Sequence, residues 1–528
     1  MDTSSYAAVE LAKSWLGACI QRHEGCAIPE RTPLPRRVLD ISNHRVRLRE
    51  TNGKMGSYVA LSHCWGPKPI VMTVRSNYES HLSDIPWSAL SKTFQDCITF
   101  AWRLEYRYVW IDSLCIIQDD RDDWAIEASK MAQIFSNAQL TIAATRSIDG
   151  AGGCFSQRSS EPISINPPKG FTPVEDSRIW DPFMVKGLDR DGQQKTFCAR
   201  ISVPHGLENA PLLQRAWVFQ EQILSSRILH FAPGELYWEC KSYVACECRG
   251  EEKRAESAQK ETRTRKAYGQ LVRKNVPLAA DSNEHKAQKK RDFEAYTSLV
   301  EQYMDLSITK DVDRLPALSG ITFGRKDEYL AGMWRSMLVE SLHWTTSYTK
   351  TARRIGYRPI PSRAPTWSWA SMESPIRHIS QNSATDKDKL KEYATIIAAS
   401  CSPEGPDVRG RVSGGYLRIR GPISTARVSA ISSRRTTIGK SDTSATLNSG
   451  DTTFECSLDV PLVLGKKEPA EVQVGDEVTC LRISHEVALV LRNHPSTEGA
   501  FQRVGILEIA YKDLNIFSST REDSVFIL

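Results

Sequence analysis

The sequence predicts an α/β protein, in which a parallel sheet flanked by helices is followed by a helical middle segment and a C-terminal antiparallel β-domain. Strand-like and helix-like segments alternate between Tyr58 and Phe231, which is the pattern of βαβ units. After Tyr416, apolar and polar residues alternate in short runs, as in an antiparallel sheet with one covered face. The 528 residues exceed the roughly 250 to 300 that one core supports, so we expect two or three domains.

The first segment, residues 6–20, predicts an amphipathic helix. Glu10 and Lys13 interrupt its apolar residues, which excludes the apolar core of a signal peptide. No stretch approaches the roughly 18 apolar residues that a membrane helix needs, so we expect no membrane partner. Without an export signal, the sequence predicts a cytoplasmic protein whose 13 cysteines are reduced thiols.

The elements of the α/β region follow from hydrophobic periodicity. Apolar residues recur every three or four positions where we expect helices, and form short buried runs where we expect strands. Strands are expected at residues 37–41, 57–62, 107–112, 140–144 and 227–231. Helices are expected at residues 88–104, 124–138 and 217–225, and residues 113–122 are expected to form a polar loop.

The second half of the chain predicts a different architecture. Residues 293–343 have a helical pattern, residues 363–371 form a loop rich in Pro and Trp, and residues 487–491 and 504–509 are expected strands. The stretch 424–453 is rich in Ser and Thr, which predicts a mobile loop. The expected segments are 1–50 (N-terminal helix and strand), 51–248 (α/β domain), 249–292 (charged insertion), 293–385 (helical segment and Trp-rich loop) and 386–528 (β-domain).

Basic residues concentrate in the insertion, residues 249–292. The net charge of the whole chain is only +6, and the basic residues of the insertion alternate with acids. Aromatic residues, which stack on bases in nucleic-acid sites, are almost absent from it. A solvated helical or disordered insertion is therefore favoured, and no nucleic-acid partner is expected.

Three long motifs resemble the fungal heterokaryon-incompatibility (HET) domain family. They are Y-V-A-L-S-H-C-W-G at 58–66, Y-V-W-I-D-S-L-C-I-I-Q-D-D at 108–120 and W-A-I-E-A-S-K-M at 124–131. The similarity continues through R-A-W-V-F-Q-E-Q-I-L at 215–224 and the Trp-Ser-Trp loop at 367–369, and the insertion is where the chain departs from the family pattern. The resemblance implies self/non-self recognition between fungal cells, with cell death as the output. It also implies self-association and an incompatibility partner protein.

A more distant resemblance, of HET domains to TIR domains, implies a TIR/flavodoxin-like sheet and an enzymatic reaction. Some TIR domains hydrolyse NAD with a glutamate that lies four residues after a tryptophan, and Trp217 and Glu221 have this spacing. The resemblance therefore implies that Glu221 is catalytic and that NAD is a substrate, with no cofactor. The alternative is that Glu221 favours the first turn of its helix or pairs with Arg215 or Arg227.

The segments after two neighbouring strands supply the expected substrate-binding residues, because ligands bind outside the carboxyl ends of parallel strands. Together with Trp217 they are Ser62, His63, Trp65, Gly66, Asp112, Gln118, Asp119 and Asp120. We expect Ser62, Asp112 and Glu221 to converge on one cleft. The alternative is that Asp112 and Asp120 cap the following turn or helix and that His63 is a packed core histidine.

Two groups of residues are candidate metal ligands: Cys19, His23 and Cys26, and Cys240, Cys246 and Cys248 as further ligands. Neither group has the paired C-x-x-C spacing of a zinc ribbon, so the sequence predicts no metal site.

Two functions of different class stay open. One is an enzyme, an NAD nucleosidase that destroys NAD or a related nucleotide. The other is a non-catalytic adaptor that acts by self-association and partner recruitment. On the first hypothesis, expression of the HET region should impair growth, and Glu221→Gln should relieve the toxicity. If Glu221 is a solvated helix residue, that substitution should change stability by no more than roughly half a kcal/mol.

Overall fold

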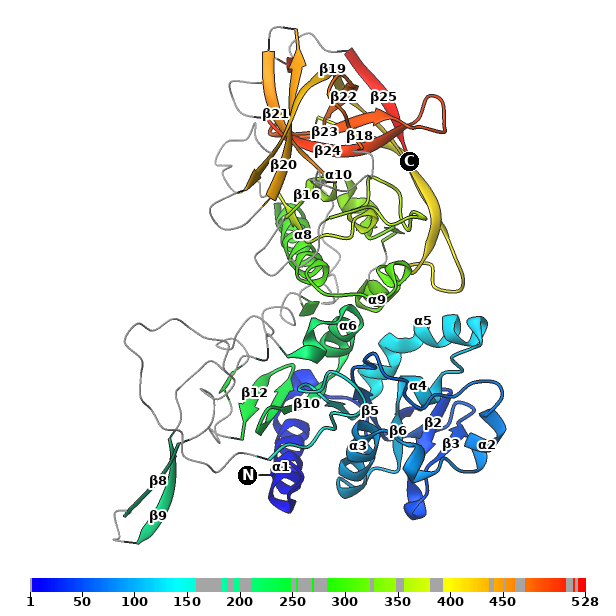
Figure 1. The fold of residues 1–528 in the computed structure, drawn as a ribbon, viewed down its shortest axis with the longest axis vertical. Helices are drawn as coiled ribbons and strands as arrows, with labels where there is room; N and C mark the ends of the chain where they lie inside the picture. The colour runs from blue at the N-terminus through cyan, green and yellow to red at the C-terminus, as the bar shows by residue number, and fades with distance from the viewer. Residues whose placement is uncertain are drawn as a thin grey trace. The chain divides into compact units, whose positions relative to one another are not determined.

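The chain forms two compact units, Met1–Arg263 (unit 1) and Thr264–Leu528 (unit 2) (Figure 1). The computed structural model describes residues 2–157, 183–188, 193–199, 207, 210–247, 253–254, 268–269, 283–322, 327–347, 356–379, 393–435, 441–450, 452–460, 471–509, 516–517 and 521–528. The finer segment boundaries expected from the sequence stay a prediction.

Unit 1 is built on a mixed sheet, which has nine strands within the described residues, in the order β13-β12-β11-β10-β7-β5-β6-β2-β3. The four central strands, β10, β7, β5 and β6, run parallel, and the strands on either side are antiparallel. The strands are β2 (Arg37–Asp40), β3 (Arg47–Glu50), β5 (Tyr58–Ser62), β6 (Tyr108–Trp110), β7 (Leu140–Ala143), β10 (Arg227–Ala232), β11 (Glu235–Cys240), β12 (Tyr243–Cys246) and β13 (Lys253–Arg254). Two separate ladders join β1 (Thr32–Pro33) to β4 (Met55–Gly56) and β8 (Phe183–Leu188) to β9 (Gln194–Ala199).

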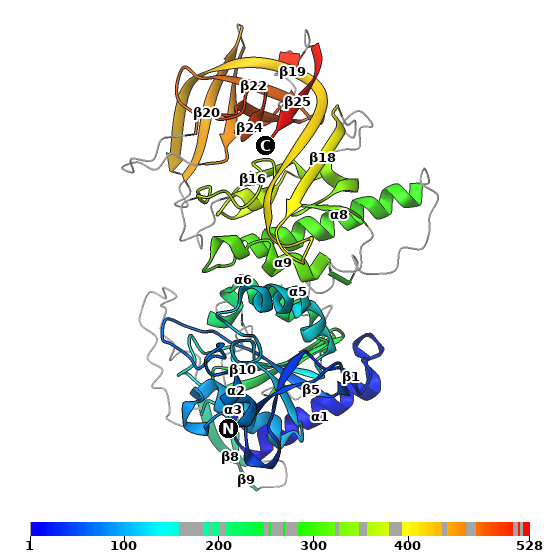
Figure 2. The same cartoon turned by 90° about the vertical axis from the view of Figure 1, so that its right-hand side faces the viewer.

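Helices cover both faces of this sheet. They are α1 (Tyr6–Arg22), α2 (Tyr78–Ser83), α3 (Lys92–Arg103), α4 (Asp112–Cys115), α5 (Arg121–Asn137) and α6 (Ala216–Leu224). In both ribbon views α5 and α6 lie on one side of the sheet and α1 and α3 on the other (Figure 2). Every residue of β5 and β7 is buried in consequence, as in parallel strands covered on both faces.

The predicted α/β class of unit 1 is confirmed, and two details differ. The expectation of a largely parallel sheet holds only for the centre, because two-residue connections join β10 to β11 and β11 to β12, and such short links allow only antiparallel pairing. The expected loop at 113–122 is a helix at its start, since α4 begins at Asp112 and ends at Cys115.

Unit 2 begins with one long helix and several short elements. The helix is α8 (Asn283–Met304), which includes the last residues of the predicted charged insertion. The prediction of helix throughout 293–343 is wrong after Met304, where α9 (Pro316–Ser319) and α10 (Leu338–Ser341) have four residues each. Small ladders lie between and after them: β14 (Tyr329–Leu330) with β15 (Met333–Trp334), and β16 (Trp344–Thr346) with β17 (Ile376–His378). Pro316 lies in the first turn of α9, where its missing backbone N–H costs no helical hydrogen bond.

The Trp-Ser-Trp loop forms part of the core of unit 2. Trp367 and Trp369 are buried, and the indole Nε1 of Trp369 donates a 2.8 Å hydrogen bond to the carbonyl of Gly332. Gly332 has a φ of +98°, and a Cβ there would lie 2.7 Å from Cζ2 of Trp369. The loop therefore has a packing role, with glycine required opposite it.

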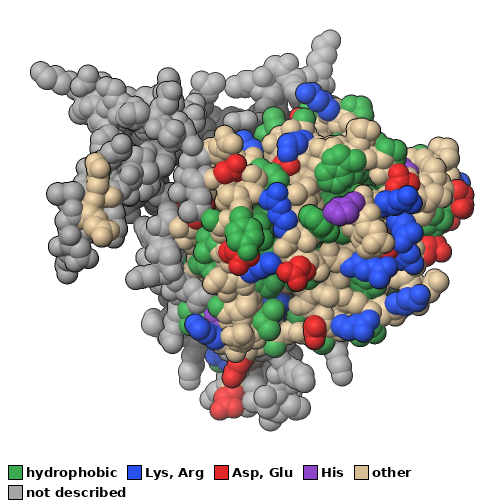
Figure 3. All heavy atoms as spheres, turned by 90° about the horizontal axis from the view of Figure 1, so that it is seen from below, with side chains coloured by type: hydrophobic (Ala, Val, Ile, Leu, Met, Phe, Trp, Pro, Cys, Tyr) green, Lys and Arg blue, Asp and Glu red, His purple; other side chains and the backbone are tan. Residues whose placement is uncertain are grey.

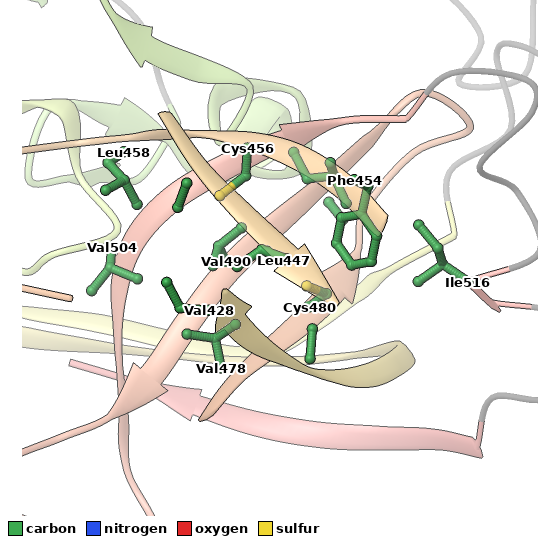
Figure 4. Packing of buried hydrophobic residues seen from close by; sticks show 14 of the residues in the cluster. Val428, Leu447, Phe454, Cys456, Leu458, Val478, Cys480, Val490, Val504 and Ile516 are labelled. Carbon is green, nitrogen blue, oxygen red and sulfur yellow. The ribbon is translucent and has the colours of Figure 1, made fainter. Parts of the chain in front are cut away.

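The rest of unit 2 is a β-barrel, which confirms the predicted C-terminal antiparallel β-domain. Its strands are β18 (Thr395–Pro403), β19 (Val412–Arg435), β20 (Ser441–Ser449), β21 (Thr452–Leu458), β22 (Glu477–Arg482), β23 (Val487–Asn493), β24 (Phe501–Glu508) and β25 (Arg521–Ile527). The long β19 pairs with β20 and also with β22, which closes the sheet on itself. Apolar side chains fill the interior, as Figure 4 shows for Val428, Leu447, Phe454 and Val490.

The mobile loop predicted for residues 424–453 is wrong, because this stretch contains the second half of β19, all of β20 and the start of β21. Val428 and Leu447 are buried, whereas Ser429 is exposed and Ser444 and Thr446 are partly exposed. Small polar residues thus occupy the outer face of two strands whose inner face is apolar. The alternation of buried and exposed residues with a period of two indicates strands, although the overall Ser and Thr content resembles that of a loop.

The surface of unit 1 carries charges of both signs. On the face seen in Figure 3, Lys and Arg side chains alternate with Asp, Glu and hydrophobic side chains. A single carboxylate oxygen, Oδ2 of Asp40, lies within 3.2 Å of side-chain nitrogens of three arginines, Arg47, Arg49 and Arg107. In the part of the chain that the structure describes, no helix is long and apolar enough to span a membrane.

Candidate functional site

The ends of β5 and β6 lie next to each other in the sheet. The two strands are parallel, with Ala60 opposite Trp110, so the residues that follow them emerge at the same edge. Ser62 is the last residue of β5, and Asp112 comes two residues after the end of β6. The geometry therefore brings together the two predicted groups of substrate-binding residues.

Glu221, the predicted catalytic residue, is buried on α6. It is 7% exposed, and burial raises the pKa of its carboxyl to about 7, helped by the charge of Asp112 and opposed by the Ser62 hydroxyl and the Arg215 guanidinium. The Ser62 hydroxyl and the charges of Asp112 and Arg215 thus all act on the Glu221 carboxyl. Ion pairing of Glu221 with Arg227, the alternative weighed from the sequence, does not occur, because Arg227 bonds elsewhere.

His63 is a buried, neutral imidazole. Its pKa is lowered by burial, which outweighs the opposing effect of Asp112, whose Oδ1 lies 3.7 Å from His63 Nδ1. The ring packs edge-on against Phe94 at a centroid distance of 5.0 Å. This supports the core-histidine alternative in part, but Nε2, on the other side of the ring, has no hydrogen-bond partner.

Asp112 connects the two strand ends. Its Oδ2 accepts a 2.9 Å hydrogen bond from Nε1 of Trp65, and its Oδ1 accepts one of 2.7 Å from the backbone N–H of Ser113. Gln118 donates to the backbone carbonyl of Asp112 at 3.1 Å. Asp112 therefore helps the first turn of α4, as the capping alternative proposed, and also fixes Trp65.

Gly66 is required by close packing. It has a φ of +71°, and a Cβ there would lie 2.2 Å from the Cβ and 2.9 Å from the Cα of Asp149. Any other residue would have to displace backbone, so the glycine allows the loop after β5 to pass the segment after β7.

Three other predicted residues have structural partners instead. Asp120 caps α5, since its side chain accepts hydrogen bonds from the backbone N–H groups of Asp122 and Asp123. Asp119 accepts a 2.8 Å hydrogen bond from the backbone N–H of Arg75. Trp217 is half-buried and packs edge-on against Trp124, at a centroid distance of 6.2 Å. The capping alternative for Asp120 is thus confirmed.

Sequence reasoning missed Arg215 as a site residue. Its guanidinium donates a 3.0 Å hydrogen bond to the backbone carbonyl of His63, and its charge lowers the pKa of Glu221, His63 and Cys64. It stands at the N-cap position of α6, in the motif that also contains Trp217 and Glu221. Arg215 could have been identified from the sequence, because it is the basic residue of the R-A-W motif that begins the segment containing Glu221.

Two buried polar atoms of this cluster have no hydrogen-bond partner of good geometry. They are Oγ of Ser62 and Nε2 of His63, both within a few residues of the end of β5. Buried polar atoms are normally paired, so these two atoms could each accept one further hydrogen-bonding group.

A family model described as heterokaryon incompatibility protein (HET) matches residues 58–221. The chain contains a HET domain. The match begins at Tyr58, the first residue of β5, and ends at Glu221, so its two ends enclose every predicted site residue. Comparison with curated proteins and with solved structures gave no match.

The sheet that contains the matched residues extends beyond them on both sides. β7 pairs on one side with β5, which lies inside the match, and on the other side with β10, which begins at Arg227 after its end. β6 likewise pairs with β2, which precedes the match. The matched segment therefore supplies the site, and flanking segments complete the sheet that holds it.

Proposed function

We propose that this HET protein triggers cell death in heterokaryon incompatibility by hydrolysing NAD or a related nucleotide at the nicotinamide–ribose bond. The observation that carries the proposal is Glu221, a buried carboxyl with a pKa of about 7, next to the unpaired hydroxyl of Ser62. A carboxyl with such a pKa is poised between its two protonation states near neutral pH, as in many catalytic sites.

The reaction breaks the bond between C1′ of the ribose and the nicotinamide nitrogen. The electron pair of that bond goes to the pyridinium ring, which leaves as neutral nicotinamide, and positive charge develops on the ribose. The ionised carboxylate of Glu221 would stabilise this charge and bind the ribose hydroxyls. Water then adds its oxygen to C1′ and releases a proton to solvent.

The neighbouring groups suit this role. Ser62 Oγ and His63 Nε2 would bond to ribose hydroxyls, since both are buried and neither has a hydrogen-bond partner of good geometry in the described structure. Neutral His63 adds no positive charge that would oppose the forming cation. Arg215 keeps the pKa of Glu221 from rising further, so that a large fraction is ionised at pH 7 to 8.

The test is release of nicotinamide from NAD by the purified full chain, measured by chromatography between about pH 5.5 and 8.5. We expect the rate to rise with pH and to reach half its maximum near the Glu221 pKa of about 7. Glu221→Gln should lower the rate roughly a hundredfold or more.

The matched control is Glu127→Gln on α5. Glu127 is also a buried glutamate with a pKa raised by burial, but the charges acting on it are those of Lys130, Arg37, Asp123 and Arg36. Loss of activity in both variants would point to a general effect of removing a buried carboxylate. Absence of nicotinamide release from a chain that still kills cells would favour the non-catalytic adaptor.

A further inference from the structure

Four side chains from two distant parts of the sequence meet in unit 1: Cys19, His23 and Cys26 from the N-terminal segment, and Cys240. One ligand atom from each, three Sγ atoms and one imidazole nitrogen, all lie within 4.8 Å of one another. The first three come from the end of α1 and the 3₁₀ turn Glu24–Cys26, and the fourth is the last residue of β11. The cluster is outside the matched HET segment and independent of the proposed function.

The spacing of these atoms suits a tetrahedral metal ion. With Zn–S near 2.3 Å and Zn–N near 2.0 Å, tetrahedral ligands stand roughly 3.5 to 3.8 Å apart. Nδ1 of His23 and Sγ of Cys240 are 3.4 Å apart. Cys19, Cys26 and Cys240 are free thiols, so no disulfide accounts for the convergence of their sulfurs.

The local backbone holds the ligands in this arrangement. The N–H of His23 bonds to the carbonyl of Cys19, and the N–H of Cys26 bonds to the carbonyl of His23, so the chain turns back at the end of α1. The His23 ring stacks on Tyr243 with centroids 4.4 Å apart. Trp15 of α1 also packs against Trp238 of β11, which brings the helix to the strand near the cluster.

A second observation concerns charge. Arg227 is buried, and its guanidinium bonds to Sγ of Cys19 at 3.3 Å and to the backbone carbonyls of Cys26 and Gln139. Among the residues that the structure describes, no carboxylate forms an ion pair with it. A buried cation without an anionic partner is energetically costly. Three thiolates bound to one Zn²⁺ leave a single net negative charge, which would neutralise the Arg227 guanidinium.

Further contacts match those of metal-bound thiolates. The backbone N–H of Tyr243 points at Sγ of Cys240 at 3.2 Å, and the hydroxyl of Ser242 lies 3.6 Å from Sγ of Cys26. Such donors do not bind the metal themselves but stabilise its thiolate ligands by hydrogen bonding to them. All four ligand residues are buried, with exposures of 0% to 5%, which leaves no open position for substrate.

We propose that Cys19, His23, Cys26 and Cys240 bind one structural Zn²⁺ ion that fastens α1 to the edge of the unit 1 sheet. The sequence predicts no metal site because no C-x-x-C pair is present, but the fourth ligand lies 217 positions after His23 and spacing alone cannot reveal it. Cys246, weighed as a ligand from the sequence, is not in the cluster, and Cys248 lies outside the described residues.

The test is the metal content of the full chain, purified without chelators from zinc-supplemented cells and measured by plasma mass spectrometry. We expect about one zinc per chain in the parent, and less than about a tenth as much in Cys240→Ala. Cys246→Ala is the control, because it removes a buried cysteine of the neighbouring strand that is not a ligand. It should retain the parent's zinc content.

A second measurement keeps the test decisive if Cys240→Ala does not fold. Cobalt added to the parent protein should give the intense visible absorption of tetrahedral Co²⁺–thiolate, and chelation of zinc should lower its melting temperature. A folded parent without zinc, a disulfide between two of the three cysteines, or unchanged zinc in folded Cys240→Ala would each overturn the proposal.

Discussion

The indole nitrogen of Trp65 donates a 2.9 Å hydrogen bond to Oδ2 of Asp112. This bond links the loop after β5 to the first turn after β6. His63 Nδ1 also lies 3.7 Å from the other carboxylate oxygen, so two residues after β5 face the same carboxylate. The site is thus held together across the sheet edge by Asp112.

Trp65→Phe tests this link. The substitution keeps an aromatic side chain but removes the indole N–H and one of the two fused rings, so unit 1 should lose at least about 1 kcal/mol of unfolding free energy, the typical contribution of one hydrogen bond. Urea unfolding followed by circular dichroism would measure the change. Trp102→Phe is the control, because Trp102 is 48% exposed. Equal effects of the two substitutions would show that the bond to Asp112 contributes nothing.

Glu221→Gln should stabilise unit 1 at alkaline pH. The folded-state pKa of about 7 lies above the ordinary value of 4.5, so the folded protein holds a proton that the unfolded chain releases. The stability from this group is fully present below pH 4.5 and is lost as pH rises through 7. At pH 8 the parent should be less stable than the variant by up to about 3 kcal/mol.

Unfolding of the two proteins at pH 4.5 and pH 8 would check this prediction. The expectation that the substitution changes stability by at most roughly half a kcal/mol assumed a solvated helix position. That assumption is wrong, since Glu221 is buried. A stability difference that does not grow with pH would contradict the raised pKa.

Expression of the full chain in a fungal host should impair growth, and Glu221→Gln should relieve the toxicity. The swap keeps the size of the side chain and removes the charge that would stabilise a cationic transition state, at a cost of roughly a hundredfold or more in rate. Growth curves with equal protein levels by immunoblot would measure the effect. A variant that accumulates normally and still kills would exclude catalysis by Glu221 as the cause of death.

Gly66→Ala should destabilise unit 1 by more than Gly53→Ala does. Both glycines have left-handed φ angles, +71° and +73°, so both substitutions carry a backbone cost of roughly 1 kcal/mol or more. Only at Gly66 would the new methyl group overlap Asp149, because Gly53 has no neighbour within 4 Å. The difference in melting temperature between the variants isolates the overlap, and equal values would refute it.

Leu447→Ala should destabilise the barrel of unit 2 by about 2 to 5 kcal/mol, since Leu447 is fully buried in its core. Val474→Ala is the comparison, because Val474 is 63% exposed and its loss should change stability by no more than about half a kcal/mol. Denaturant unfolding of the full chain gives both values. A mild effect at Leu447 would mean that the barrel interior is loosely packed.

The central strands and the meeting of Ser62 with Asp112 were predictable from sequence. Both depend on local signals: short apolar runs separated by helices, and the rule that parallel strands end at one edge. The burial of Glu221 was not predictable in the same way. A nine-residue helix that is apolar on most sides gives no indication of which residue faces the sheet edge, and the answer depends on how α6 packs on the sheet.

Two further features lay beyond any local pattern. The outward Ser and Thr residues of β19 and β20 resemble those of a loop, and only pairing such as Val428 with Leu447 reveals the strands. Cys240 reaches Cys19, His23 and Cys26 because β11 folds back along β10, and that register is decided by the whole sheet. Long-range pairing carries no signature in the spacing of residues.

The position of β10 has a consequence for synthesis of the protein. β7 is complete by Ala143, but its second neighbour, β10, begins only at Arg227. While the ribosome makes the intervening residues, the nascent chain presents the buried, apolar β7 as an open strand edge, a template for pairing with another chain. Translation speed and chaperone access between these two points therefore govern how much newly made protein reaches its native state instead of aggregating.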